Sequence, residues 1–289
     1  MSDPSRTILA LSVGVLVMSA AGSAQTPSFS VRVESVRVDV LVADGGRAIL
    51  GLQPDDFEVL DNGVPQHVDL LSFDQIPLNV ILALDVSNSV AGERLQQLRD
   101  AGRGILDALG KDDQAAVVTF SHAVTLAAPL AKNLAAARSA LTAADGVGET
   151  SLVDGVYAGM MIGESDAGRA LLIVFSDGLD TTSWLTETAV LETAKRSDVV
   201  AYGAAITTSG NASFLRELSS FTGGTHYKVE STRDLRGTFL KILDEFRHRY
   251  LLSYSPAGVS KDGWHRLDVR VKNRRATVKA RPGYLAGPS

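Results

Sequence analysis

The stretch that decides the fold is residues 78–89, LNVILALDVSNS. Its first eight residues are almost all apolar, which is typical of a strand buried on both faces of a parallel sheet. A helical pattern follows at about residues 93–109, and a second strongly apolar run, RALLIVFSD, occupies residues 169–177. Buried strands that alternate with helices in this way indicate a doubly wound, mostly parallel α/β sheet.

The same alternation continues through the middle of the chain. Further strands are expected at residues 115–121, 199–206 and 225–229, and further helices at about 132–144, 151–164, 187–196, 212–221 and 233–248. An α/β domain is therefore predicted over residues 77–248.

The sequence on either side of this domain has the period of β-strands. Apolar and polar side chains alternate over residues 29–44, and short apolar pieces separated by turn residues continue to residue 76. Alternation returns after Arg249. We expect an antiparallel β module over residues 29–76 and a second β segment over residues 249–285. The two flanks either stand apart as separate modules or form one β-sandwich interrupted by the α/β domain.

The charges of the two flanks favour the single sandwich. Residues 29–76 carry 3 Arg and 9 acidic residues, a net charge of -6, whereas residues 247–289 carry 10 basic and 2 acidic residues, a net charge of +8. The 14 basic and 21 acidic residues of segment 77–246 give it a net charge of -7. Each flank is too short to bury a good core alone, so flanks of opposite sign are expected to pack on each other.

Composition excludes several classes of protein. The chain has 289 residues, a formal net charge of -5 and no cysteine. Thiol catalysis, thiolate zinc sites, iron–sulfur clusters and disulfides are therefore impossible. The mild acidity argues against a nucleic-acid-binding protein, whose binding domain is usually basic.

The amino terminus has the pattern of a signal peptide. Residues 1–24 contain Arg6, an apolar run from Ile8 to about Met18, and small residues ending at Ala24. The run is shorter than the roughly 20 residues that a spanning helix needs. We expect cleavage near residue 24 and export of the rest to the periplasm or the medium, with no membrane span left. An uncleaved amino-terminal anchor is the alternative.

Polar residues follow the first buried strand, at the edge where doubly wound sheets bind their ligands. Asp85, Ser87 and Ser89 are alternate oxygen donors in a tight loop. Thr150 precedes a predicted helix, and Asp177 ends the second apolar strand. Hard oxygen ligands with open positions for water are what Mg²⁺ prefers. A bare D-x-S-x-S motif is better explained as a helix cap, but the additional threonine and aspartate favour a metal site.

These motifs resemble the von Willebrand factor A (VWA) domain, whose metal-ion-dependent adhesion site consists of D-x-S-x-S, a later Thr and a later Asp. Asp85, Ser87, Ser89, Thr150 and Asp177 match all five positions. The resemblance implies that the serines and Thr150 supply hydroxyl ligands, while Asp85 and Asp177 bind the ion directly or through water. It also implies Mg²⁺ or Mn²⁺ as the ion and a partner protein that presents Asp or Glu to it. The flanks are similar to those of exported bacterial VWFA-related proteins.

The sequence thus predicts a non-enzymatic, exported, metal-dependent adhesion or protein-interaction module, and two alternatives stay open. The first is a structural envelope module with a vestigial site, or with a site closed by its own Glu149 or Asp180. The second is a Mg²⁺-dependent phosphoryl-transfer enzyme. Against it, Ser87 stands where haloacid-dehalogenase-type phosphatases have a second Asp, and the sequence has no G-x-S-x-G, P-loop or H-E-x-x-H motif. No two of the five histidines have metal-ligand spacing: His67, His122, His226, His248 and His265.

Overall fold

The computed structural model describes residues 35–73, 76–177, 179–206 and 212–287. The predicted signal peptide and the first residues of the predicted strand 29–44 lie outside these ranges. No helix within them is both long and apolar enough to cross a membrane.

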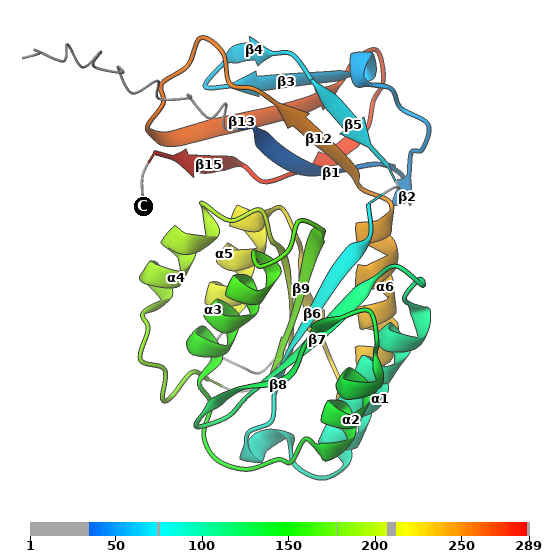
Figure 1. Ribbon diagram of the computed structural model, residues 1–289, viewed down its shortest axis with the longest axis vertical. Coiled ribbons are helices and arrows are strands. Elements are labelled where there is room, and N and C mark those ends of the chain that lie inside the picture. The colour runs from blue at the N-terminus through cyan, green and yellow to red at the C-terminus, as the bar shows by residue number, and fades with distance from the viewer. Residues whose placement is uncertain (1–34, 74–75, 178, 207–211, 288–289) are drawn as a thin grey trace, which may run out of the picture. The chain divides into compact units, whose positions relative to one another are not determined.

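A six-stranded sheet forms the centre of the α/β domain (Figure 1). Its order is β11-β10-β9-β6-β7-β8, and every neighbouring pair is parallel except β7 and β8. The two central strands, β6 and β9, are buried at every position, which explains their continuous apolar sequence. The predicted doubly wound sheet is confirmed. Its strands are β6 (Leu78–Asp85), β7 (Gln114–Phe120), β8 (Val124–Ala131), β9 (Arg169–Ser176), β10 (Val200–Ile206) and β11 (His226–Val229).

Helices cover both faces of this sheet (Figure 1). Helices α1, α2 and α6 pack on one face with Leu82 and Leu84 of β6, whereas α3, α4 and α5 pack on the other face with Ile81 and Ala83. Successive β6 side chains therefore enter opposite cores, as the two-residue period of a strand requires. The helices are α1 (Glu93–Ala108), α2 (Ala135–Ala143), α3 (Leu152–Gly163), α4 (Glu187–Ala194), α5 (Ala212–Thr222) and α6 (Leu235–Arg247).

The flanking strands pair with one another rather than as two separate modules. Strand β1 (Val36–Asp44) lies between β12 and β14, and β3 (Phe57–Asp61) pairs with β13. One sheet has the order β14-β1-β12-β5, with β2 beside β1, and the other has the order β15-β13-β3-β4. Both sheets therefore contain strands from both flanks. The remaining strands are β2 (Arg47–Ala48), β4 (Val64–Gln66), β5 (Leu70–Ser72), β12 (Tyr250–Tyr254), β13 (Gly263–Val271), β14 (Thr277–Lys279) and β15 (Gly283–Ala286).

A buried polar network holds the two flanks together. Asp61 at the end of β3 is fully buried and accepts hydrogen bonds from the hydroxyl groups of Tyr254, at 2.9 Å, and Tyr284, at 2.8 Å. Its other oxygen lies 2.7 Å from Nδ1 of His265. Burial, together with Asp61, raises the pKa of both tyrosines, which therefore remain protonated donors. One amino-terminal carboxylate thus fixes three carboxyl-terminal strands.

The close contact of β13 and β15 gives a first prediction. A Cβ atom added at Gly283 would lie 2.2 Å from the backbone oxygen of His265, which cannot move without distorting the sheet. We expect Gly283→Ala to lower the free energy of unfolding by about 1–3 kcal/mol. The matched control is Gly237→Ala in α6, where a Cβ meets nothing within 4 Å, and which is expected to raise stability by up to about 1 kcal/mol. Urea unfolding followed by circular dichroism measures both, and equal stabilities would contradict the contact.

Candidate metal centre

The candidate centre lies at the carboxyl ends of the two central strands. Strand β6 ends at Asp85 and strand β9 ends at Ser176, directly before Asp177. Because β6 and β9 are parallel neighbours, their ends meet at one edge of the sheet. The loop after β6 continues into a short 3-10 helix, η2 (Asn88–Val90), which places Ser87 and Ser89 on the same side as Asp177.

Asp85 is fully buried and held by hydrogen bonds at both carboxylate oxygens. Oδ1 accepts the backbone N–H of Ser87 at 2.9 Å, and Oδ2 accepts the hydroxyl of Ser176 at 2.7 Å. Burial raises the pKa of Asp85, and the nearby charge of Asp177 adds to this, whereas the bonds from Ser87 and Ser176 lower it. The carboxylate is therefore fixed in orientation, and a nearby cation would favour its ionised form.

A chain of hydrogen bonds joins the first loop to Asp177. The hydroxyl oxygens of Ser87 and Ser89 lie 3.0 Å apart, and Ser89 donates its hydroxyl to Oδ1 of Asp177 at 2.6 Å. The structure thus brings four of the five sequence-predicted residues into one connected group. Two carboxylates and two hydroxyls in such a group form a hard oxygen donor set.

Thr150, the fifth predicted residue, lies in the loop before α3 and is buried. Backbone hydrogen bonds fasten its loop to the first loop: the N–H of Asn88 donates to Gly148 at 2.9 Å, and the N–H of Val147 donates to Val86 at 2.9 Å. Within the described residues, the Thr150 hydroxyl makes no hydrogen bond to the other four. The structure therefore places Thr150 on a loop attached to the group, without joining its side chain to it.

Arg94, in the first turn of α1, also contacts the group and is not among the residues predicted from the sequence. Its Nη1 lies 2.9 Å from Oδ2 of Asp177 and 3.1 Å from the backbone oxygen of Ser89. The arginine side chain is 54% exposed, whereas that of Asp177 is 1% exposed, so the guanidinium covers the carboxylate from the solvent side. The one indication in the sequence is the position of Arg94 in the first turn of a helix. The positive end of the helix dipole favours acidic rather than basic residues there, so a basic residue suggests another role.

The two acids considered for self-ligation lie differently. Asp180 accepts hydrogen bonds from the Ser183 hydroxyl at 2.5 Å and from the backbone N–H of Val153 at 3.3 Å, at the start of α3. Glu149 is exposed. Among the charged side chains of the described residues, the base Arg94 forms an ion pair with Asp177 of the group.

A hollow of about 450 Å³ adjoins the loop of Thr150. Its lining includes Ser151, His122 and Tyr157. Trp184 stands at its rim with 95% of its surface exposed, and the carboxylate of Asp154 accepts the backbone N–H of Trp184 at 2.9 Å. An exposed indole on a fixed backbone is suited to contact with another molecule.

The donor set fits a hard divalent cation better than any other metal. No three His, Asp or Glu side chains of the described residues are grouped so that they could hold a metal ion. A metal at this edge would therefore depend on hydroxyl oxygens besides Asp85 and Asp177. Hydroxyls and carboxylates suit Mg²⁺ or Mn²⁺, whereas imidazole-rich sites suit zinc and copper.

The fold and the polar edge define a class of protein: a doubly wound α/β domain with an oxygen-rich cluster at the carboxyl ends of its strands. Residues 79–241, more than half of the chain, match the family model of the von Willebrand factor type A domain. The chain belongs to this family.

Similar proteins come from distant sources. The chain is 25% identical over 190 residues to inter-alpha-trypsin inhibitor heavy chain H2 of Mus musculus. The aligned region covers 60% of this chain and 20% of that protein. It is 31% identical over 88 residues to an uncharacterized protein of Synechocystis, covering 30% of this chain and 21% of that protein. The chain thus spans about a fifth of the length of these relatives.

Solved structures show the same fold. A von Willebrand factor type A protein from Catenulispora acidiphila superposes with a TM-score of 0.55 at 13% identity, covering 85% of this chain and 76% of that one. Proximal thread matrix protein 1 from the mussel byssus gives a TM-score of 0.54 at 16% identity, covering 65% and 51% of the two chains.

Proposed function

We propose that this chain is an exported, metal-dependent protein-binding module and not an enzyme. Asp85, Ser87, Ser89, Thr150 and Asp177 would hold Mg²⁺ or Mn²⁺, and an Asp or Glu of a partner protein would complete the coordination. The observation that carries the proposal is the connected group of Asp85, Ser87, Ser89 and Asp177 at the carboxyl edge of the sheet. Membership of the VWA family supports it, as does the resemblance of the five residues in sequence to the metal-site pattern of that domain.

The chemistry of the donor set explains why the ligand would be an acid. The two carboxylates would offset the charge of +2 on the ion, and the neutral hydroxyl ligands would add no negative charge. In a partly shielded cleft, an incoming carboxylate gains Coulomb attraction when it replaces a water on the ion. The buried carboxylate of Asp85 keeps its orientation through its hydrogen bonds from Ser87 and Ser176. The partner acid would then displace Arg94 or approach the ion beside it.

Removal of the metal gives the test of this function. With the purified chain as bait, a Mg²⁺-dependent partner from an envelope extract is expected to be retained in Mg²⁺ and released by EDTA. The variant Asp177→Ala is expected to retain nothing in either buffer, because it lacks a carboxylate ligand. A partner held equally with and without EDTA would contradict metal-dependent binding.

The ion pair of Arg94 with Asp177 favours a second candidate, a structural module whose site is closed by its own guanidinium. The two candidates differ in the behaviour of Arg94→Gln. Loss of a positive charge beside the ion is expected to tighten Mg²⁺ binding by roughly tenfold, a modest effect because the side chain is half exposed. Calorimetric titration of both proteins measures the change. A wild-type chain that binds no Mg²⁺, beside an Arg94→Gln variant that does, would establish the closed module instead.

A further inference from the structure

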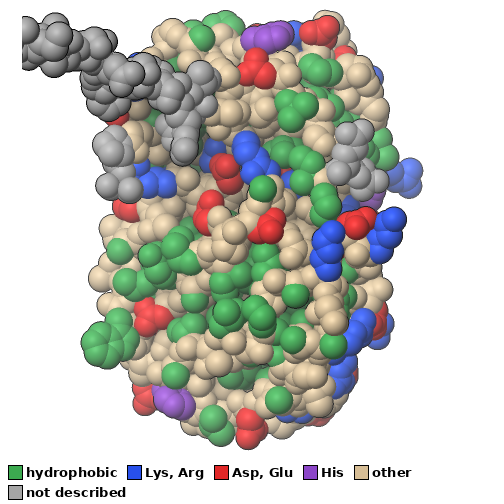
Figure 2. All heavy atoms as spheres, in the orientation of Figure 1, with side chains coloured by type: hydrophobic (Ala, Val, Ile, Leu, Met, Phe, Trp, Pro, Cys, Tyr) green, Lys and Arg blue, Asp and Glu red, His purple; other side chains and the backbone are tan. Residues whose placement is uncertain are grey.

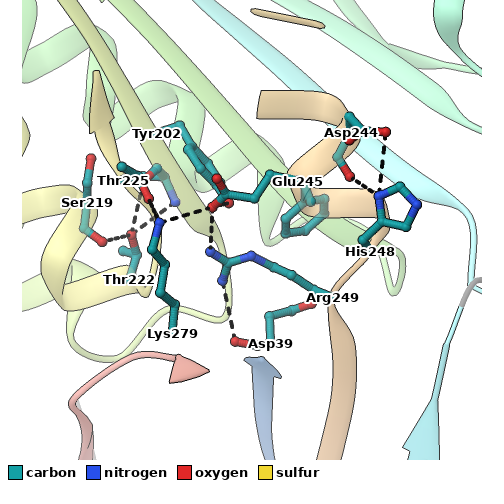
Figure 3. A network of polar contacts seen from close by, with 12 residues as sticks. Asp39, Tyr202, Ser219, Thr222, Thr225, Asp244, Glu245, His248, Arg249 and Lys279 are labelled. Carbon is teal, nitrogen blue, oxygen red and sulfur yellow. Dashed lines mark hydrogen bonds and ion pairs between the residues drawn. The ribbon is translucent and has the colours of Figure 1, made fainter. Parts of the chain in front are cut away.

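A second polar hollow of about 580 Å³ lies where α5, β11 and β14 meet, at the β11 edge of the sheet. It shares no lining residue with the candidate metal centre. We call it the basic groove and define it by three cations and three hydroxyls: Arg216, Lys228, Lys279, Ser219, Ser220 and Thr225. Figure 3 shows one side of it, where Lys279 points toward Thr225 and Glu245.

The charge of the basic groove is not balanced by its own lining. No carboxylate is among the lining residues. Two other hollows in the described part of the chain contain acids beside their cations: in one Arg247 pairs with Asp113 at 2.7 Å, and in the other Arg169 pairs with Asp39. A lining that contains three cations and no carboxylate is therefore unusual in a chain whose net charge is -5.

The cations of the basic groove are largely free to bind a ligand. Arg216 and Lys228 are exposed and form no ion pair with any described residue. The Nζ atom of Lys279 lies 3.2 Å from Oγ1 of Thr225. It lies 3.7 Å from Oε1 of Glu245, and this second distance is long for an ion pair. Figure 2 shows the more usual pattern, with acidic and basic side chains interspersed over much of the face that it presents.

The three cations line the same hollow as His226. Burial lowers the pKa of His226, which lies in the same lining, and the charges of Arg216 and Lys228 lower it further. Arg216 extends from α5 and Lys228 from β11, and both side chains line this one hollow. The two cations can thus contact one ligand.

Capping of α5 does not account for the cations. Two of the last four carbonyl groups of this helix already have backbone donors: Gly224 donates to Ser219 at 2.8 Å, and Gly223 donates to Ser220 at 3.3 Å. Basic residues near a helix end often satisfy such carbonyls. Within the described residues, neither Arg216 nor Lys228 donates a side-chain hydrogen bond to a backbone carbonyl, so both side chains are left for a ligand.

We propose that the basic groove binds phosphate or sulfate groups carried by a larger anionic ligand. Guanidinium and ammonium groups donate charge-assisted hydrogen bonds to tetrahedral oxyanions, and the hydroxyls of Ser220 and Thr225 are additional donors beside them. The groove is several times larger than one such ion, which favours a ligand with more than one charged group. This binding goes beyond the proposed metal-dependent function and requires no metal.

The test is calorimetric titration of the whole chain with sodium tripolyphosphate in the presence of EDTA. We expect saturable binding by the wild type that weakens as NaCl is added. The double variant Arg216→Gln/Lys228→Gln is expected to bind at least about tenfold more weakly. The matched control is Arg274→Gln/Arg275→Gln, which removes the same charge from an exposed turn outside the groove and is expected to bind like the wild type.

Two outcomes would overturn the proposal: a wild type that does not bind tripolyphosphate, or a control that loses as much affinity as the groove variant, which would indicate attraction to net charge alone. Circular dichroism checks the fold of each variant, and Lys228→Gln alone serves if the double variant is unfolded. Cosedimentation with phosphatidylcholine vesicles, with and without phosphatidylglycerol, identifies the source of the phosphate. Binding that requires phosphatidylglycerol indicates a lipid headgroup, whereas binding to tripolyphosphate only indicates a soluble phosphate compound.

Discussion

Asp177→Ala is expected to weaken Mg²⁺ binding by at least about 100-fold, equivalent to about 2.7 kcal/mol. The residue supplies one of the two carboxylates of the proposed centre, and hydroxyl ligands cannot replace its charge. The fold is expected to survive, because the partner left behind, Arg94, is 54% exposed and can be solvated by water. Calorimetric titration with MgCl₂ measures the affinity.

The matched control for this variant is Asp145→Ala. Asp145 is an exposed acid in the loop that leads to Thr150, so its removal changes the net charge equally without removing a proposed ligand. We expect the control to bind Mg²⁺ like the wild type. If Asp177→Ala also kept the wild-type affinity, the assignment of Asp177 as a ligand would be wrong.

Arg169→Met is expected to lower the free energy of unfolding by about 3–5 kcal/mol. Arg169 begins β9, and its Nε donates to Oδ1 of Asp39 in β1 at 3.0 Å. The two side chains are 2% and 8% exposed. Loss of the arginine leaves the carboxylate buried without its cation, and it also removes the stacking of the guanidinium on Phe246, 4.9 Å from the ring centroid.

A surface ion pair provides the comparison. Arg138 and Asp107 lie 2.6 Å apart, but their side chains are 47% and 57% exposed. Arg138→Met is expected to cost less than about 1 kcal/mol. Urea unfolding of both variants measures the difference, and the double variant Arg169→Met/Asp39→Leu is expected to recover part of the loss. An Arg169→Met protein as stable as Arg138→Met would show that the buried pair does not stabilise the fold.

The sequence alone predicts the sheet and its helices because burial on both faces leaves an unmistakable apolar run. Strands β6 and β9 are buried throughout and were expected at residues 78–85 and 169–177. Strand β8 is harder to predict. It is an edge strand with one fully buried position, Ala128, and its pairing with β7 has register shifts. Its sequence therefore lacks the regular alternation that indicates a strand.

The polar contacts of the structure could not be predicted in the same way. The order of motifs suggested Asp85, Ser87, Ser89 and Asp177 as neighbours because each follows a recognisable strand. The pairing of Arg94 with Asp177 spans 83 residues, and that of Arg169 with Asp39 spans 130. Neither has a periodic signal, since one contact between distant residues depends on how whole elements pack.

Calorimetric titration of the metal-free wild-type chain with Mg²⁺ tests whether this edge of the sheet binds a metal ion. We expect saturable binding at one site per chain, and we expect Mn²⁺ to compete with Mg²⁺ for this site. Absence of binding in both the wild type and the Arg94→Gln variant would contradict the proposal that this edge of the sheet is a metal centre.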